Sequence, residues 1–347
     1  MNDVTLAIFI LWMFIFIYSI LGSIDFGTGF WAMLFDRRGS KTNAGAIANR
    51  FLSPTWKVTN VFLVLLVVAL VGFFPRSMYT LAAVLVLPVG LALLLLTIRS
   101  TFMVFAFAFR KWSRLLIVVS GVTGLLIPGL LISVLPVTLG GFVTIGDGVP
   151  HLELAKLFSS STEYAHLGFG LSTELFLSAI FLADYSREAE DEEAYRIYRK
   201  LGILLGPLTL IMAILTTITM APEAAWIIEG FQEQALWFGY SVIAFLFGYS
   251  ALFWKRKNGL IGFPRWTVAA VIVQYALASY AYGVSHMPYL INPILTIEQG
   301  FTNHTMFRSL LIGYTVSSIV LAPVFYWFWR LFLKDKRYLK QEPEGSS

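Results

Sequence analysis

Long apolar segments alternate with short polar loops along the 347-residue chain. A helix needs about 20 apolar residues to cross a bilayer, and nine segments approach or exceed that length. They cover roughly residues 4–34, 54–74, 79–108, 114–136, 164–183, 201–221, 235–254, 264–285 and 306–332. The runs are continuous rather than alternating, which favours helices over the strands of a membrane barrel. The pattern therefore predicts an all-α integral membrane protein with nine transmembrane helices.

The spacing of these segments divides them into groups of four, four and one. We expect a first four-helix bundle, an outer connection, a second four-helix bundle, an outer loop with a peripheral ninth helix, and a cytoplasmic tail. These units cover residues 1–136, 137–163, 164–285, 286–333 and 334–347. Within the loops, we expect a short surface helix around Trp226 and a mixed-charge helix over residues 184–200.

The basic residues are distributed unevenly between the two sets of loops. Of 25 Lys and Arg residues, 21 lie on one side of the predicted membrane and three on the other, while Arg99 lies within a span. Cytoplasmic loops carry such an excess, so the N-terminus is predicted outside and the C-terminus in the cytoplasm. Because the charge follows the loops, the net charge of +5 reflects membrane topology, and we expect no nucleic-acid partner. The chain has no cysteine, which excludes disulfides and thiolate metal sites.

Three ionisable residues, Asp25, Arg99 and Glu174, fall well inside predicted spans. A charge at the bilayer centre costs about 2.5–3.5 kcal/mol on insertion scales. At 1.5 Å per residue, Asp25 and Arg99 lie about 13 Å and about 15 Å from the inner boundary. The two opposite charges are therefore expected at the same depth. Ser23 adds a hydroxyl beside Asp25. The second span begins with side chains expected between this level and the inner surface, namely Trp56, Lys57, Thr59 and Asn60.

Two interpretations of the Asp25–Arg99 pair remain open. A buried ion pair can fix two helices without taking part in chemistry. Alternatively, intramembrane acids commonly mark proton relays, and the pair would then form a proton-conducting site open to the cytoplasm. Glu174 is a second candidate for proton or quinone chemistry. A secondary transporter or ion channel could use the same buried pair, and a purely structural membrane scaffold is a third class.

The four histidines are predicted at or beyond the outer membrane boundary. They are His151, His166, His286 and His304. A bis-histidine haem within a bundle needs two histidines that face each other from neighbouring spans. The chain is therefore not expected to supply such a site, and no metal or cofactor is assigned to it.

Three stretches resemble a known family. SIDFGTG (23–29) resembles the Gly-x-Asp-x-Gly-x-Gly stretch in subunit II of the cytochrome bd quinol oxidases, bacterial terminal oxidases. PTWKVTNVF (54–62) is similar to the Pro-x-Trp motif that opens its second span, and LLLTIRSTF (94–102) places Arg99 where that family keeps an arginine. These motifs cover about the first 110 residues. YGVSHMPYLINP (282–293), the chain length and the topology agree with the family over the remainder.

This resemblance implies a multi-pass subunit of the bacterial cytoplasmic membrane, in a complex that oxidises quinol and reduces oxygen to water. It implies that two haems b and one haem d reside in the larger subunit I, and that subunit II binds no haem. Asp25, Arg99 and Trp56 take the positions of the motif acid, arginine and tryptophan. The quinone used and the presence of a small third subunit stay open.

The sequence also departs from the family pattern. Ser23 replaces the first glycine of the motif, and Lys57 stands after the tryptophan where many members carry an acid. A second carboxylate in the proton route is therefore not expected on this span, and Lys57 is interpreted as a charge at the cytoplasmic rim.

Overall fold

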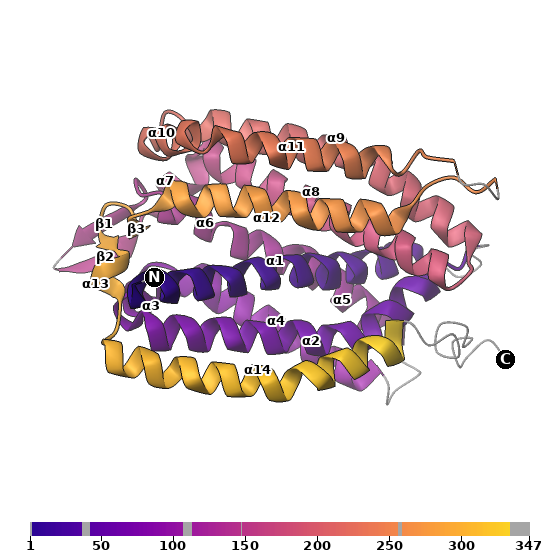
Figure 1. Ribbon diagram of the computed structural model, residues 1–347, viewed down its shortest axis with the longest axis horizontal. Helices are drawn as coiled ribbons and strands as arrows, with labels where there is room; N and C mark the ends of the chain where they lie inside the picture. The colour runs from indigo at the N-terminus through magenta and orange to yellow at the C-terminus, as the bar shows by residue number, and fades with distance from the viewer. Residues whose placement is uncertain (1, 37–41, 107–112, 147, 256–258, 334–347) are drawn as a thin grey trace.

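The protein is an assembly of long helices that run side by side, as a computed structural model shows (Figure 1). The structure describes residues 2–36, 42–106, 113–146, 148–255 and 259–333. The predicted tail, 334–347, lies outside these residues. The long helices are α1 Asp3–Phe35, α2 Ala44–Phe73, α4 Val86–Ala106, α5 Ser113–Ile132, α8 Ser161–Glu188, α9 Glu192–Met220, α12 Pro264–His286 and α14 His304–Leu333. Each of these eight contains a stretch long and apolar enough to cross a membrane.

The seventh predicted span, 235–254, is shorter than expected. It forms α11, Ala235–Ser250, and is preceded by the surface helix α10, Ala225–Glu233. Sixteen residues rise about 24 Å, which is less than a hydrocarbon core of about 30 Å. Within the described residues, helix length and composition therefore identify eight spans rather than nine. The surface helix predicted around Trp226 is confirmed as α10.

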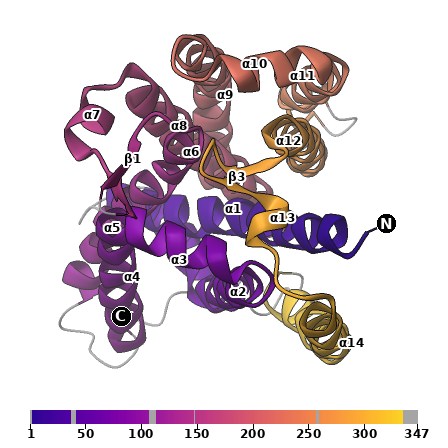
Figure 2. The same ribbon diagram turned by 90° about the vertical axis from the view of Figure 1, so that its left-hand side faces the viewer.

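The third predicted span, 79–108, is not one helix. It divides at Leu85 into α3, Pro75–Val84, and α4. Pro88 explains the break, because a proline has no N–H to donate to the carbonyl four residues earlier and its ring clashes with that carbonyl. The end view in Figure 2 shows α3 crossing one end of the molecule, while α4 runs along it.

Helix α1 lies at the centre of the arrangement. It packs against α2 and α5 on one side and against α8 on the other, and α8 packs in turn against α9 and α12. Helix α11 pairs with α12, and α14 lies at the edge against α2 (Figures 1 and 2). The SIDFGTG segment therefore runs through the middle of the protein, in contact with both groups of helices.

The end of the molecule that carries Asp3, here called the N-terminal face, is closed by short elements. They are α6 Val134–Thr138, β1 Val143–Gly146, β2 Val149–Leu152, α7 Leu154–Ser159, β3 Tyr289–Ile291, β4 Leu295–Thr296 and α13 Ile297–Gly300. Strands β1 and β2 pair antiparallel, with Val143 opposite Leu152, and β3 pairs antiparallel with β4. The sequence pattern predicted these segments as loops, except for the first residues of α6, which fall within the fourth predicted span, 114–136.

At the other end of the molecule, here called the opposite face, α8 and α9 meet in a tight turn. The prediction of a separate helix over 184–200 is wrong, because α8 continues to Glu188 and α9 begins at Glu192. Asp191 caps α9 by accepting a hydrogen bond from the Ala194 N–H at 2.9 Å. Such capping satisfies a helix-terminal N–H group, and it explains why the charged segment turns instead of continuing.

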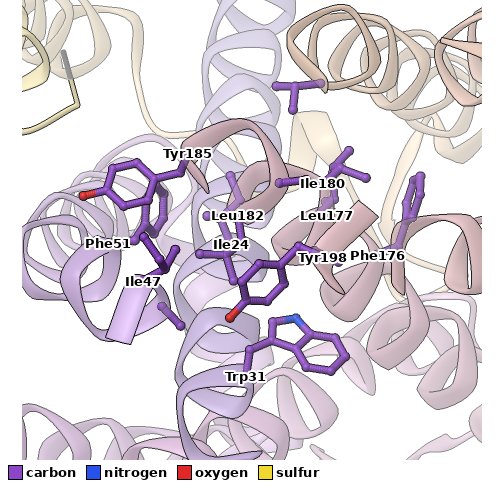
Figure 3. Close-up of a cluster of buried hydrophobic side chains, with 14 of the residues drawn as sticks. Ile24, Trp31, Ile47, Phe51, Phe176, Leu177, Ile180, Leu182, Tyr185 and Tyr198 are labelled. Carbon is purple, nitrogen blue, oxygen red and sulfur yellow. The ribbon is translucent and has the colours of Figure 1, made fainter. Parts of the chain in front are cut away.

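A large apolar cluster joins α1, α2, α8 and α9 near the opposite face (Figure 3). Ile24 and Trp31 of α1 pack there with Ile180 of α8 and Tyr198 of α9, each of them buried. The Tyr198 hydroxyl donates to the Ala44 carbonyl oxygen at 2.7 Å, which fixes the start of α2 to α9. This packing fixes how far α1 is shifted along its axis relative to α8. It thereby fixes the positions of the acidic side chains that the two helices carry.

Candidate functional site

The segment Ile24–Gly29 of α1 is buried on every side. A helix surrounded by protein on all faces must place even its polar residues inside. Asp25 is accordingly only 3% exposed. The carboxylate that stands alone in the apolar sequence thus lies in the interior of the fold rather than on a lipid-facing surface.

Glycines allow the neighbouring helices to approach this segment closely. A Cβ atom on Gly27 would overlap the Ser178 hydroxyl of α8 and come within 2.9 Å of the Glu174 carbonyl oxygen. On α5, a Cβ on Gly124 would overlap the Phe26 carbonyl oxygen. Small residues at helix interfaces permit such backbone approach in membrane proteins. The glycines therefore bring α5 and α8 against the turn that carries Asp25.

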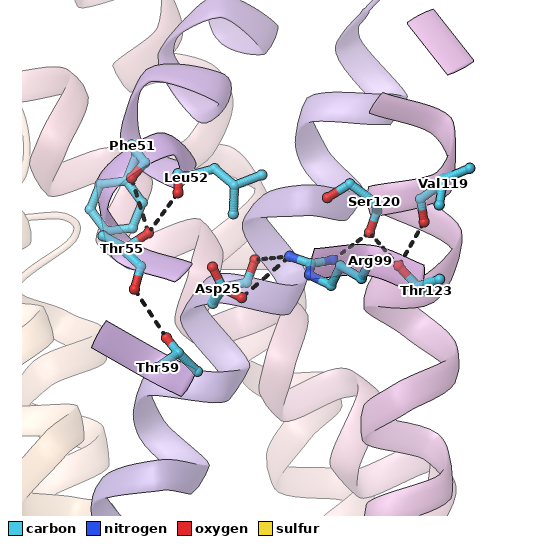
Figure 4. Close-up of polar contacts among 9 residues, drawn as sticks. All are labelled: Asp25, Phe51, Leu52, Thr55, Thr59, Arg99, Val119, Ser120 and Thr123. Atoms are coloured by element: carbon cyan, nitrogen blue, oxygen red, sulfur yellow. Dashed lines mark hydrogen bonds and ion pairs between the residues drawn. The ribbon is translucent and has the colours of Figure 1, made fainter. Parts of the chain in front are cut away.

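Arg99 of α4 reaches across to α1 and binds this turn (Figure 4). Its Nη2 lies 3.3 Å from Asp25 Oδ2 and donates to the Asp25 carbonyl oxygen at 3.1 Å. Its Nη1 donates to the Ser120 carbonyl oxygen of α5, and the guanidinium lies 5.0 Å from the centre of the Phe26 ring. Arg99 is 2% exposed. The expected meeting of Asp25 and Arg99 at one depth is present, and the arginine ties three helices together.

Glu174 of α8 is the third ionisable group of the site. It is fully buried, and within the part of the chain that the structure describes neither Oε1 nor Oε2 has a hydrogen-bond partner. It interacts electrostatically with both Arg99 and Asp25. The structure therefore assembles all three charged residues found within the predicted spans, and we call Asp25, Arg99 and Glu174 the acid–arginine cluster.

Further buried polar atoms on α1 and α5 have no hydrogen-bond partner among the described residues. They include Asp25 Oδ1, the Thr28 and Ser120 hydroxyls, and the Tyr18 hydroxyl, which interacts electrostatically with Asp25. Buried polar groups normally have a partner, often an ordered water. Such a set of hydrogen-bonding groups around two acids is suited to binding water and passing protons. Ser120 and Tyr18 were missed by the sequence reasoning, because a hydroxyl in an apolar run is common and gives no signal of its partners.

The α2 residues do not lie where the sequence suggested. A Cβ on Gly45, near the start of α2, would be 3.0 Å from the Phe35 backbone at the end of α1. The two helices are antiparallel, and both extend from this contact toward the N-terminal face with the same rise per residue. Asp25 of α1 is therefore level with the turn from Thr55 to Thr59 of α2 (Figure 4). The expectation that Trp56, Thr59 and Asn60 lie between Asp25 and the inner surface is therefore wrong. They lie level with Asp25 or closer to the N-terminal face.

Their contacts also separate them from the cluster. Thr59 is buried, but its hydroxyl donates within α2 to the Thr55 carbonyl oxygen at 3.3 Å. The buried Trp56 Nε1 has no hydrogen-bond partner. Lys57 is exposed, with its ammonium 5.9 Å from the centre of the Trp56 ring. Asn60 and Ser23 are half-buried. Of these predicted residues, Trp56 has a buried N–H donor without a partner among the described residues, whereas Lys57 is exposed.

An apolar layer covers the cluster on the side of the N-terminal face. Phe26, Leu96 and Ile127 form this layer, with Leu63, Leu95 and Leu131 packed against it. Leu96 precedes Arg99 by one turn of α4, and Ile127 follows Ser120 by two turns of α5, so both lie nearer that face. On the other side of Asp25, α1 carries the Thr28 hydroxyl, which has no partner. Polar groups without a partner thus lie on both sides of Asp25 along α1, since Tyr18 is nearer the N-terminal face and Thr28 is nearer the opposite face.

The histidines lie away from this site, toward the N-terminal face. Nδ1 of His166 is 2.7 Å from the Thr162 carbonyl oxygen at the start of α8, and Nδ1 of His286 is 2.9 Å from the Tyr289 carbonyl oxygen. Nδ1 of His304 lies 2.8 Å from Asp3 Oδ2, and His151 is exposed on β2. Among the described residues, no group of three or more His, Asp or Glu side chains could hold a metal ion.

Comparison with known proteins identifies the family. The family model for cytochrome bd terminal oxidase subunit II matches residues 3–332. The chain belongs to that family. It is 46% identical over 343 residues to the putative cytochrome bd menaquinol oxidase subunit II of Bacillus subtilis (strain 168), covering 98% of this chain and 99% of that protein. It also resembles a chain in the structure of bd oxidase from Geobacillus thermodenitrificans, with 34% identity, a TM-score of 0.81, and coverage of 97% of this chain and 100% of that chain.

Membership of the subunit II family confirms the resemblance carried by SIDFGTG, PTWKVTNVF and LLLTIRSTF. It extends the relationship from the first 110 residues to nearly the whole chain. The chain is therefore a helical membrane component of an oxidoreductase complex.

Proposed function

We propose that this subunit II delivers protons from the cytoplasm, through Asp25, for the reduction of oxygen to water. The observation that carries the proposal is the buried Asp25–Arg99 pair, in which one Asp25 oxygen and the nearby Thr28 and Ser120 hydroxyls have no partner among the described residues. A pair that served only to fix two helices would satisfy its remaining lone pairs with fixed donors. The unused groups here are suited to water, which is needed to carry protons through a membrane protein.

The direction of delivery follows from the charge of the loops. The excess of Lys and Arg assigns the opposite face to the cytoplasm and the N-terminal face to the outside. The apolar layer of Phe26, Leu96 and Ile127 lies between the cluster and the outside. We therefore propose that protons reach Asp25 by way of Thr28, with Trp56 as a donor at the same level. Ser23, Thr59 and Asn60 are less suited to this route, because they lie level with Asp25 or closer to the N-terminal face. Lys57 is proposed to act only as a charge on the cytoplasmic side.

In the complex, the chain packs against a larger subunit I that holds two haems b and one haem d. It binds no haem itself and is not catalytic alone. The substrate would be a quinol, and menaquinol is favoured by the name of the Bacillus subtilis relative. Whether a small third subunit is present does not affect this assignment.

We further propose nine membrane spans, with α11 as the short seventh. Two bundles, residues 1–136 and 164–285, would then be joined by the 137–163 connection, with α14 at the periphery. An odd number of spans agrees with an outer N-terminus and a cytoplasmic C-terminus. A secondary transporter or ion channel is not favoured, because the whole-chain match is to an oxidase subunit.

The proposal is tested by Asp25→Asn in the purified complex. The amide keeps the size of the side chain but cannot carry a proton as a carboxylate does. Turnover should fall at least ten-fold, a barrier increase of about 1.4 kcal/mol, while assembly and haem spectra persist. Asp184→Asn is the matched control, because Asp184 makes the same kind of pair with Arg265 at the surface. Normal turnover of Asp25→Asn would rule out the proton role. Loss of the whole complex would favour a structural pair.

A further inference from the structure

The acid–arginine cluster contains two acids but one base. Arg99 bonds to the Asp25 side chain, the Asp25 carbonyl and the Ser120 carbonyl, so its donors are directed at α1 and α5. Glu174, which faces the same site from α8, receives none of them. As whole residues, Asp25, Arg99 and Glu174 are 3%, 2% and 0% exposed. Bulk water is therefore not available to stabilise an unbalanced charge.

Charge balance determines how many protons this cluster holds. Two ionised acids beside one arginine leave a net charge of −1 in a medium where charge is expensive to bury. Neighbouring carboxylates that cannot both ionise share one proton. With one acid protonated, the positive charge of Arg99 and a single carboxylate cancel. The cluster is neutral only in this state.

The hydrogen bonds indicate which acid holds the proton. A hydrogen bond to the charged form favours ionisation, and Asp25 accepts one from Arg99 at 3.3 Å. Glu174 accepts none from the described residues, although it interacts electrostatically with both Arg99 and Asp25. Gly27 brings the backbones of α1 and α8 together beside Glu174, and no hydrogen bond within the described residues joins the two acid side chains.

We propose that Glu174 is the proton-holding member of this cluster, and that Asp25 and Glu174 share a single exchangeable proton that is passed on during turnover. The O–H bond of Glu174 breaks when its proton leaves for the oxygen-reducing subunit. A proton from the cytoplasmic side, arriving by way of Asp25, then forms that bond again. No electron is transferred in this step. The inference rests on the proposed function, since it names the group that receives the proton from Asp25.

The test combines infrared spectroscopy with turnover of the whole complex. The wild-type complex should show a stretching band of a protonated carboxyl group that changes when the enzyme turns over. Glu174→Gln should remove that band and lower turnover at least ten-fold, while haem spectra persist. Glu174→Asp should keep a carboxyl band at a shifted frequency and recover part of the turnover. Glu163→Gln is the matched control, because Glu163 is a buried acid on α8 that is hydrogen-bonded to Ser133 instead.

Each outcome of this test either supports or overturns the proposed role of Glu174. A band that persists unchanged in both Glu174 variants, or normal turnover of Glu174→Gln, would overturn it. If Glu174→Gln does not assemble, the shifted band of Glu174→Asp still assigns the proton, and an unshifted band refutes the assignment. Failure of the proposed function is recognised separately. In that case Asp25→Asn also turns over normally, whereas failure of this inference alone leaves Asp25→Asn impaired.

Discussion

Two arginine–carboxylate pairs of this protein show that distance alone does not measure the importance of an ion pair. Near the opposite face, Arg265 Nε lies 2.9 Å from Asp184 Oδ2, and its Nη2 lies 3.0 Å from Glu188 Oε1. The buried Arg99–Asp25 pair is longer, at 3.3 Å. The Arg265 side chain is 54% exposed, however, whereas that of Arg99 is 3% exposed.

The difference lies in what happens when one partner is lost. Water and salt replace the partner of an exposed charge, so surface pairs contribute about 0–1 kcal/mol. A buried charge has no such substitute, and removing its partner costs about 3–5 kcal/mol. The fold is therefore expected to require the interior pair, and the energy of the pair is expected to respond strongly to any change in the charge of either partner. That sensitivity makes it suitable for controlling the position of a proton.

The largest effect should follow from Arg99→Leu. This change leaves Asp25 and Glu174 without a positive charge and removes the bonds that join α4 to α1 and α5. We expect a loss of about 3–5 kcal/mol in stability, measured as a lower thermal midpoint and a lower yield of haem-containing complex. Arg99→Lys keeps the charge but not the forked geometry, so its loss should be smaller. Wild-type stability of Arg99→Leu would contradict the account of the interior pair.

A smaller effect is expected from Gly27→Ala. The added Cβ atom overlaps the Ser178 hydroxyl and presses on the Glu174 carbonyl oxygen, which forces α1 and α8 apart. Overpacking of this kind costs about 1–3 kcal/mol. Gly90→Ala is the control, because a Cβ at Gly90 meets nothing within 4 Å. Equal thermal midpoints for the two variants would show that the close approach of α1 and α8 is not needed.

The smallest effect is expected from Arg265→Gln. This change breaks both exposed ion pairs, yet stability should fall by less than about 1 kcal/mol, and turnover should remain at the wild-type value. Thermal unfolding and oxygen consumption are the measurements. A loss as large as that of Arg99→Leu would remove the contrast between the exposed and the interior pair.

The buried pair could be predicted from sequence because each charge stands alone in an apolar run. The rise of a helix gives depth directly, so the level of Asp25 and Arg99 follows from counting residues to the end of each span. The same reasoning found Glu174 as a buried acid. It could not place Glu174 beside Arg99, because that depends on how α8 is rotated against α1, which the Gly27 contact and the apolar cluster of Figure 3 determine.

Other features were harder to predict from the sequence, for related reasons. The break at Leu85 depends on one proline within an apolar run, and the strands of the N-terminal face are only two to four residues long. Thr59 and Asn60 were misplaced because their level was counted from residue 54, the start of the predicted span. The helix itself already begins at Ala44, so it meets the end of α1 before the predicted span starts.

The most direct test of the central claim is proton uptake by the complex in liposomes, with Asp25→Asn compared with Asp184→Asn. Uptake should be measured during steady quinol oxidation, with a pH-sensitive dye on the side of the opposite face. The account predicts that Asp25→Asn takes up protons at least ten times more slowly than Asp184→Asn, which should match the wild type. Equal rates for the two variants would contradict it.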